Sequence, residues 1–109
     1  SFASRFEDGQ GTNPEEMIGA AHAGCFSMAL AAGLDAEGYE PESIETSAEV
    51  TIQQKGDDFV IPSVVLKTRA SVPNIDRGTF RDIAEAAKDN CPVSKALRGV
   101  DIRLEASLN

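Results

Sequence analysis

The stretch Thr12-Asn13-Pro14-Glu15-Glu16, followed by MIGAAHAGCFSMALAAGL over residues 17–34, decides the fold of this chain. Its asparagine is a good helix N-cap, its proline suits the first helical position, and its two glutamates complement the positive end of a helix. Residues 17–34 carry no Asp, Glu, Lys or Arg. We therefore expect one long helix from Pro14 to Gly33 or Leu34, about 30 Å long at a rise of about 1.5 Å per residue.

The uncharged part of this helix is just long enough to cross a membrane. However, six of its residues are Ala and three are Gly, and His22 and Ser27 interrupt its apolar character. Such a helix is too weakly apolar for lipid and too apolar for water, so we expect protein to bury it. Small residues that would let another backbone approach closely are Gly19, Ala20, Ala23 and Gly24.

Hydrophobic spacing predicts the elements that follow. Alternation of apolar and polar residues predicts strands, and apolar residues three and four positions apart predict a helix. We first expect a strand over residues 44–52, a turn at 55–58 and a strand over 59–72 with a bulge or an edge near Pro62. A helix capped by Asp76 should follow and stop near Asn90. A short helix from Cys91-Pro92 that ends at Gly99 and a strand over 100–106 should come last. This order predicts an α+β fold with antiparallel strands. Three strands leave free edges and cover the long helix incompletely, so we also expect further N-terminal strands, a partner subunit, or both.

Length and composition limit the class of protein. The 109 residues suffice for one domain, residues 1–109, with a single core. The net charge of −8 and the isoelectric point near 4.5 argue against nucleic-acid backbones and anionic membranes as partners. Two cysteines do not make a disulfide framework of the secreted kind, and they suit a reducing compartment such as the cytoplasm.

The two cysteines are the main candidates for chemistry. Cys25 lies within the long helix, where a thiol can simply be a small buried hydrophobe. Cys91 precedes Pro92 at a helix start, where backbone N–H groups and the helix dipole favour a thiolate. Both cysteines lie on elements that face the core, so they can meet in the fold. The usual chemistry of such a pair is attack by one thiol and resolution by the other, and inert packing is the alternative.

Three further side chains could activate a thiol. His22 lies three residues before Cys25, so it could form a nucleophilic Cys–His pair, bond a backbone carbonyl, or pack at an interface. Glu15 lies about 15 Å from Cys25 along the helix, so it either complements the helix dipole or acts through a cation. Arg5 is the only cation ahead of the helix, and it could stabilise a thiolate or lie free on the surface. A zinc site from His22, Cys25 and Cys91 would lack a fourth ligand, so we expect no metal.

Four stretches together carry a resemblance to a known family. They are Arg5-Phe6-Glu7, Gly11-Thr12-Asn13-Pro14-Glu15-Glu16, IGAAHAGCFSMAL over residues 18–30, and Asn90-Cys91-Pro92-Val93-Ser94. At these stretches the sequence resembles the OsmC/Ohr family, the osmotically inducible and organic hydroperoxide resistance proteins. His22 and the Ser-Met-Ala that follows the helical cysteine are more similar to the OsmC branch than to the Ohr branch.

The resemblance implies an OsmC-like fold, with a long central helix packed against antiparallel sheets in an intertwined homodimer whose sites lie at the subunit interface. It implies a thiol peroxidase of oxidative and osmotic stress defence that reduces organic hydroperoxides and, less well, hydrogen peroxide. Cys25 falls at the peroxidatic position and Cys91 at the resolving position. Glu15 matches the glutamate that holds the activating arginine, and Arg5 matches that arginine. Cys25 would become a sulfenic acid, which would condense with Cys91 to a disulfide.

The implied partners are the hydroperoxide substrate, a second copy of the chain and a dithiol reductant such as a dihydrolipoyl group, with no metal or organic cofactor. Side chains expected to line a pocket for alkyl peroxides are Phe2, Phe6, Ile18 and Met28. Family members carry strands before the Arg-Phe-Glu segment that this chain lacks, so we expect an N-terminally truncated domain. Two other function classes stay open: a non-catalytic homodimerisation module with buried thiols, and a Cys–His acyl-transfer enzyme.

Overall fold

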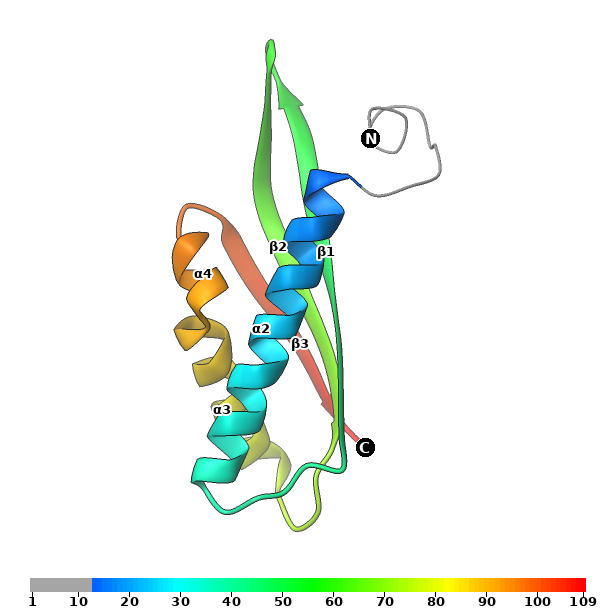
Figure 1. Cartoon of the computed structure of the whole chain (residues 1–109), viewed down its shortest axis with the longest axis vertical. Coiled ribbons are helices and arrows are strands. Elements are labelled where there is room, and N and C mark those ends of the chain that lie inside the picture. The colour runs from blue at the N-terminus through cyan, green and yellow to red at the C-terminus, as the bar shows by residue number, and fades with distance from the viewer. Residues whose placement is uncertain (1–12) are drawn as a thin grey trace.

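The structure, a computed structural model, describes residues 13–109. Its elements in chain order are α2 (Pro14–Ala36), β1 (Ser43–Lys55), β2 (Asp58–Ser71), α3 (Arg77–Asn90), α4 (Pro92–Ala96) and β3 (Asp101–Leu108). Figure 1 shows α2 lying across β1 and β2, with α3 and α4 beside it. The predicted element order is confirmed.

The long helix α2 begins where the sequence predicts. The Asn13 side chain accepts a hydrogen bond from the backbone N–H of Glu16 at 2.9 Å, as an N-cap does. The helix ends at Ala36, two residues beyond Leu34. Gly38 then turns the chain away at φ +86, a conformation that glycine adopts without a Cβ penalty.

The strands form one sheet in the order β1-β2-β3. β1 and β2 pair antiparallel around a turn at Gly56, with Ile44 opposite Ala70. Their register shifts between Thr51 and Gln53, close to Pro62 in the partner strand, which confirms the predicted irregularity there.

The third strand corrects one expectation, because β3 pairs parallel with β2 rather than antiparallel. The connection from β2 to β3 runs through α3 and α4, which carry the chain back along the sheet (Figure 1). A strand that follows such a crossover runs in the same direction as the strand before it. The α+β class is confirmed, and the sheet is mixed.

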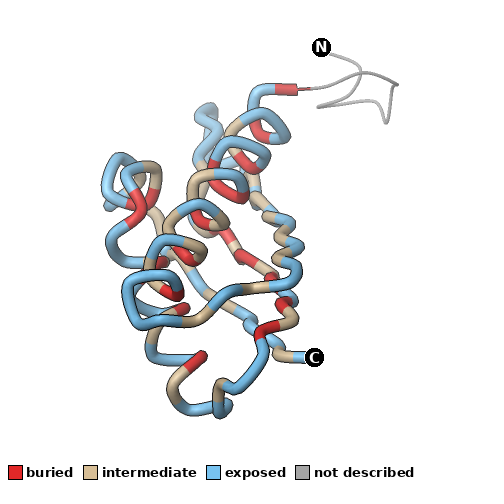
Figure 2. Tube along the Cα trace, turned by 60° about the horizontal axis from the view of Figure 1, so that its bottom comes forward, coloured by how far each residue is buried: buried red, intermediate tan, exposed pale blue. Residues whose placement is uncertain are grey.

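The core lies between the helices and one face of the sheet. Its central side chains are Phe26, Leu30 and Leu34 of α2, Val64, Leu66 and Ala70 of β2, and Phe80, Ala84 and Ala87 of α3. Figure 2 shows how buried positions recur along α2 and β2. The alternation predicted for β1 is confirmed, since the even-numbered residues 44–52 are half-buried and the odd-numbered residues between them are exposed.

Helix α2 is long and apolar enough to cross a membrane by length and composition alone, but its buried side chains pack against the strands and α3. The predicted close approach occurs at Gly19, where a Cβ would lie 3.2 Å from Val50 Cγ2 and 3.3 Å from the Ala48 carbonyl oxygen. At Gly24 a Cβ would meet nothing within 4 Å in the described part of the chain. Protein therefore buries α2 along one side, and the other side is exposed.

Candidate active site

The two cysteines meet, although 66 positions separate them in the sequence. The Sγ atoms of Cys25 and Cys91 lie 2.8 Å apart, and both thiols are free. Cys25 lies in the middle of α2 and is half-buried, whereas Cys91 is completely buried. A small reagent in solvent can therefore reach the sulfur of Cys25 more readily than that of Cys91.

Cys91 is held at the junction of two helices. Its backbone N–H donates to the Ala87 carbonyl at 2.9 Å and so closes α3, and its carbonyl accepts from the Lys95 N–H at 3.1 Å and so opens α4. Its own backbone is non-helical, with φ −59 and ψ 128, and Pro92 occupies the first position of α4. Buried alanines such as Ala84 let α3 lie close to α2, which brings this junction against Cys25.

The described residues shift the pKa values of the two thiols in opposite directions. Burial and the neighbouring Cys91 thiol raise the pKa of Cys25, and the Val93 backbone N–H only partly opposes them. Burial also acts to raise the pKa of Cys91, but hydrogen bonds from Cys25, Ser94 and Val93 outweigh it and lower that pKa overall. A negative charge on the pair therefore favours Cys91, and the described residues do not favour ionisation of Cys25.

Within residues 13–109, His22 forms a hydrogen bond neither with Cys25 nor with a backbone carbonyl, the two partners considered from the sequence. Its side chain is completely buried, and its Nε2 lies 2.7 Å from Ser94 Oγ. Burial lowers the pKa of His22, so the imidazole is neutral at physiological pH. Sequence reasoning missed Ser94 as a site residue. The signal was its place three residues after Cys91 in Cys-Pro-Val-Ser, where the third helical residue returns toward the cap.

Glu15 lies on the cysteine side of α2. It is 7% exposed in the first turn of the helix. Spacings of three, four and three residues lead from Glu15 through Ile18 and His22 to Cys25, so these side chains share one helix face. Glu15 therefore lies on the same helix face as the Cys25 thiol, at a distance along the helix that precludes direct contact.

The structure describes only two of the residues expected to form the substrate pocket, Ile18 and Met28. Ile18 is half-buried, and Met28 is 76% exposed. A pocket that includes Met28 therefore requires further atoms to cover it. Phe2, Phe6 and Arg5 lie outside the described residues, and their roles stay predictions.

An uncharged stripe runs along the exposed side of α2, next to Cys25. The exposed stripe comprises Met17, Ala21, Gly24, Met28 and Ala32, spaced four, three, four and four residues apart. Met17 and Met28 are 62% and 76% exposed. Long exposed apolar surfaces of this kind mark interaction sites.

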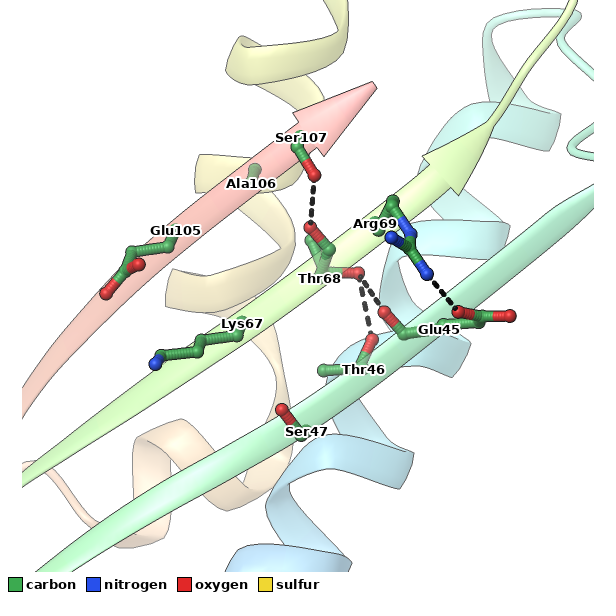
Figure 3. A pocket seen from close by; sticks show the side chains of 9 residues that line it. All are labelled: Glu45, Thr46, Ser47, Lys67, Thr68, Arg69, Glu105, Ala106 and Ser107. Atoms are coloured by element: carbon green, nitrogen blue, oxygen red, sulfur yellow. Dashed lines mark hydrogen bonds and ion pairs between the residues drawn. The ribbon is translucent and has the colours of Figure 1, made fainter. Parts of the chain in front are cut away.

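The open face of the sheet carries a separate hollow of about 550 Å³. Figure 3 shows that its side chains come from all three strands while the helices lie behind them, so the hollow faces away from both thiols. Exposed ion pairs lie at and beside it, Arg69 with Glu45 at 3.1 Å and Lys67 with Glu49 at 2.8 Å. Among residues 13–109 no group of three or more His, Cys, Asp or Glu side chains could hold a metal ion.

Comparison with known proteins gives a consistent result. The model of a family described as OsmC-like protein matches residues 7–105. The chain is 48% identical to peroxiredoxin OsmC of Escherichia coli (strain K12) over 107 residues, which cover 98% of this chain and 74% of that protein. It is 32% identical to the organic hydroperoxide resistance protein of Xanthomonas axonopodis pv. citri over 98 residues, 88% of this chain and 67% of that protein.

Solved structures have the same fold. The organic hydroperoxide resistance protein OhrB of Bacillus subtilis superposes with a TM-score of 0.78 at 33% identity, covering 95% of this chain and 75% of that one. An OsmC-like protein from Mycoplasma pneumoniae superposes with a TM-score of 0.82 at 14% identity, covering 97% and 78%, and this likeness concerns the fold alone.

Proposed function

Since the chain belongs to the OsmC-like protein family and is a cysteine-based peroxidase, we propose that it reduces organic hydroperoxides, and hydrogen peroxide more weakly, with Cys25 as the attacking thiol. The identity with peroxiredoxin OsmC exceeds that with the hydroperoxide resistance proteins, which supports the OsmC branch. The observation that carries the proposal is the 2.8 Å distance between Cys25 Sγ and Cys91 Sγ.

In the first step the Cys25 thiolate attacks an oxygen of the peroxide. The O–O bond breaks, the alkoxide takes up a proton and leaves as the alcohol, and Cys25 becomes a sulfenic acid. The half-exposure of Cys25 and the complete burial of Cys91 support this assignment of roles.

In the second step Cys91 attacks the sulfenic sulfur and displaces hydroxide, which leaves as water. A disulfide bond is about 2.05 Å long, so the two sulfurs need to approach by less than about 1 Å. A dithiol then reopens the disulfide by exchange. We propose a dihydrolipoyl group as that reductant and the cytoplasm, where thiols stay reduced, as the place of action.

Ionisation of Cys25 is the step that the described residues do not favour. The raised pKa of Cys25 calls for a nearby cation, and we propose that Arg5 supplies it and that Glu15 holds Arg5. The burial of Glu15 on the Cys25 face of α2 supports this role.

We further propose that the active form is a homodimer in which a second copy covers the exposed stripe. Cys25 borders that stripe, so a partner there would enclose the thiol. Ile18 and Met28 would then line the peroxide pocket together with Phe2 and Phe6.

The raised pKa of Cys25 is the one observation that favours the non-catalytic module with buried thiols, and the half-exposure of Cys25 and the peroxidase relatives weigh against it. A Cys–His acyl-transfer enzyme has no such support, because Nε2 of His22 bonds Ser94 instead of Cys25.

The test is the consumption of an alkyl hydroperoxide with excess dihydrolipoamide by the wild type, Cys25→Ser and Cys91→Ser. We expect turnover by the wild type and none by Cys25→Ser. Without the dithiol, Cys91→Ser should consume about one equivalent of peroxide and stall as a sulfenic acid, visible by mass spectrometry after trapping. Unchanged turnover by Cys25→Ser would refute the peroxidatic role, and normal cycling by Cys91→Ser would refute the resolving role.

A further inference from the structure

A buried polar pair lies directly behind the resolving thiol. His22 of α2 is completely buried and Ser94 of α4 is 7% exposed, and the 2.7 Å contact between His22 Nε2 and Ser94 Oγ joins the two helices. Burying two polar side chains is costly unless they bond each other well. The peroxidase steps proposed above assign no task to either residue.

The direction of the hydrogen bond follows from the second ring nitrogen. Nδ1 of His22 is buried and has no hydrogen-bond partner in the described part of the chain. A buried N–H without an acceptor is rarer than an acceptor without a donor. The ring proton therefore lies on Nε2 and is donated to Ser94 Oγ, which leaves the Ser94 hydroxyl hydrogen free to be donated elsewhere.

Cys91 is the candidate acceptor for that hydroxyl hydrogen. It precedes Ser94 by three residues at the start of α4, where a capping side chain faces the N–H groups of the first turn. The sulfur makes no side-chain capping hydrogen bond to α4. The backbone N–H and the hydroxyl of Ser94 are nevertheless among the groups that lower the pKa of Cys91 against the effect of burial. Among residues 13–109, the titratable side chains joined to Cys91 by hydrogen bonds are Cys25 directly and His22 through Ser94.

We propose that His22 and Ser94 are positioning residues, which orient one hydroxyl hydrogen toward Cys91 and so stabilise the Cys91 thiolate for disulfide formation. The inference rests on the proposed resolving role of Cys91. In that step Cys91 loses its proton, its sulfur attacks the Cys25 sulfenic sulfur, and the hydroxide that leaves takes up one proton as water. Each sulfur ends in the disulfide, Cys91 oxidised and Cys25 reduced by one electron. The same hydroxyl stabilises Cys91 as the leaving thiolate when a dithiol attacks Cys25.

The first test needs no enzyme activity. In the Cys25→Ser background Cys91 is the single cysteine of the chain, so its thiolate can be titrated by ultraviolet absorbance. We expect Ser94→Ala to lower the ionisation constant of Cys91 about tenfold, because a hydrogen bond to a charged group is lost.

Ser27→Ala is the matched control. Ser27 lies on the same helix as His22, and its hydroxyl donates to Thr46 at 2.7 Å. This variant should leave the ionisation constant of Cys91 unchanged.

The second test separates the two chemical steps in a single turnover. We expect Ser94→Ala to form the Cys25 sulfenic acid at the wild-type rate and the disulfide about tenfold more slowly, with more sulfenic acid trapped. His22→Leu should act in the same direction, and His22→Gln, which keeps an N–H donor, should restore most of the rate.

The outcomes distinguish this inference from the proposed function. An unchanged Cys91 ionisation constant in folded Ser94→Ala, or an equal shift in Ser27→Ala, would overturn the inference even in an active peroxidase. If the wild type does not react with peroxide, the proposed function fails and the titration still decides the role of Ser94. If Ser94→Ala does not fold, His22→Leu and His22→Gln decide, and equal Cys91 titrations of these two variants would overturn the inference.

Discussion

The two thiols of the site differ in solvent exposure and in the direction of their pKa shifts, and each difference has a local cause. Cys25 is half-buried because it lies between the exposed stripe and the buried face of α2. Cys91 is buried because two helices meet at it. The pKa of Cys25 is raised chiefly by burial, whereas hydrogen bonds from its neighbours lower the pKa of Cys91. The accessible thiol is thus the one whose negative charge the described residues stabilise less.

The single histidine gives the stability of the protein a defined pH dependence. Burial holds the pKa of His22 below its ordinary value of 6.5, so the unfolded chain binds a proton at a higher pH than the folded chain does. The contribution is therefore fully present above about pH 6.5 and is lost as the pH falls toward the folded pKa, by up to about 1.4 kcal/mol per pH unit. Urea denaturation at a series of pH values measures this fall.

His22→Gln is the control for that measurement, because the chain has no other histidine. The carboxylates titrate in both proteins, so the difference between the two stability curves isolates His22. We expect the curves to diverge below about pH 6.5. Curves that stay parallel down to the range of the carboxylates would mean that the imidazole is protonated equally in both states.

At the scale of elements, α2 was predictable because its start is coded locally. The cap, the proline and the two glutamates are contiguous, and the Asn13 hydrogen bond follows from them. Alternation could not give the direction of β3, because it has the same period in parallel and antiparallel strands; the two predicted helices before β3 were the signal for a parallel crossover. The contact between His22 and Ser94 was hidden from the sequence, since it joins α2 to α4 over 72 positions.

A chain of hydroxyl groups joins α2 to two strands, and we expect it to stabilise this contact. Ser27 donates to Thr46 at 2.7 Å, and Thr46 lies 2.9 Å from Thr68, which also donates to the Glu45 carbonyl at 3.2 Å. Thr68 is 4% exposed. Thr68→Val keeps the shape and removes the hydroxyl, so we expect a loss of about 1–3 kcal/mol in the free energy of unfolding.

Thr51→Val is the matched control, because Thr51 lies on the exposed face of the same sheet and its replacement should cost less than about 0.5 kcal/mol. The double variant Thr46→Val with Thr68→Val should cost less than the sum of the single variants, since neither partner is then left unsatisfied. Additive costs in urea denaturation would show that the two threonines do not interact.

At the scale of the whole molecule, the sequence predicted that one chain leaves its sheet edges and its central helix incompletely covered. Within residues 13–109 the sheet ends at β1 and β3, and the central helix presents the exposed stripe. The cysteine pairing could be predicted because each cysteine has a distinctive local setting. The pocket could not be assembled from the sequence, because Met28 is exposed and its expected neighbours belong to residues 1–12 or to a second copy.

The last prediction concerns that second copy. If a partner covers the exposed stripe, a charge within the stripe would be buried without a counter-charge, at a cost large enough to separate the subunits. We expect the wild type to sediment as a dimer and Ala21→Glu as a monomer in analytical ultracentrifugation. Ala86→Glu is the matched control, because Ala86 is an exposed alanine on α3, and this variant should stay dimeric. Since Cys25 borders the stripe, Ala21→Glu should also slow peroxide reduction. A monomeric wild type, or dimers of both variants, would refute the stripe as the interface and would leave Cys25 exposed beside uncovered apolar surface.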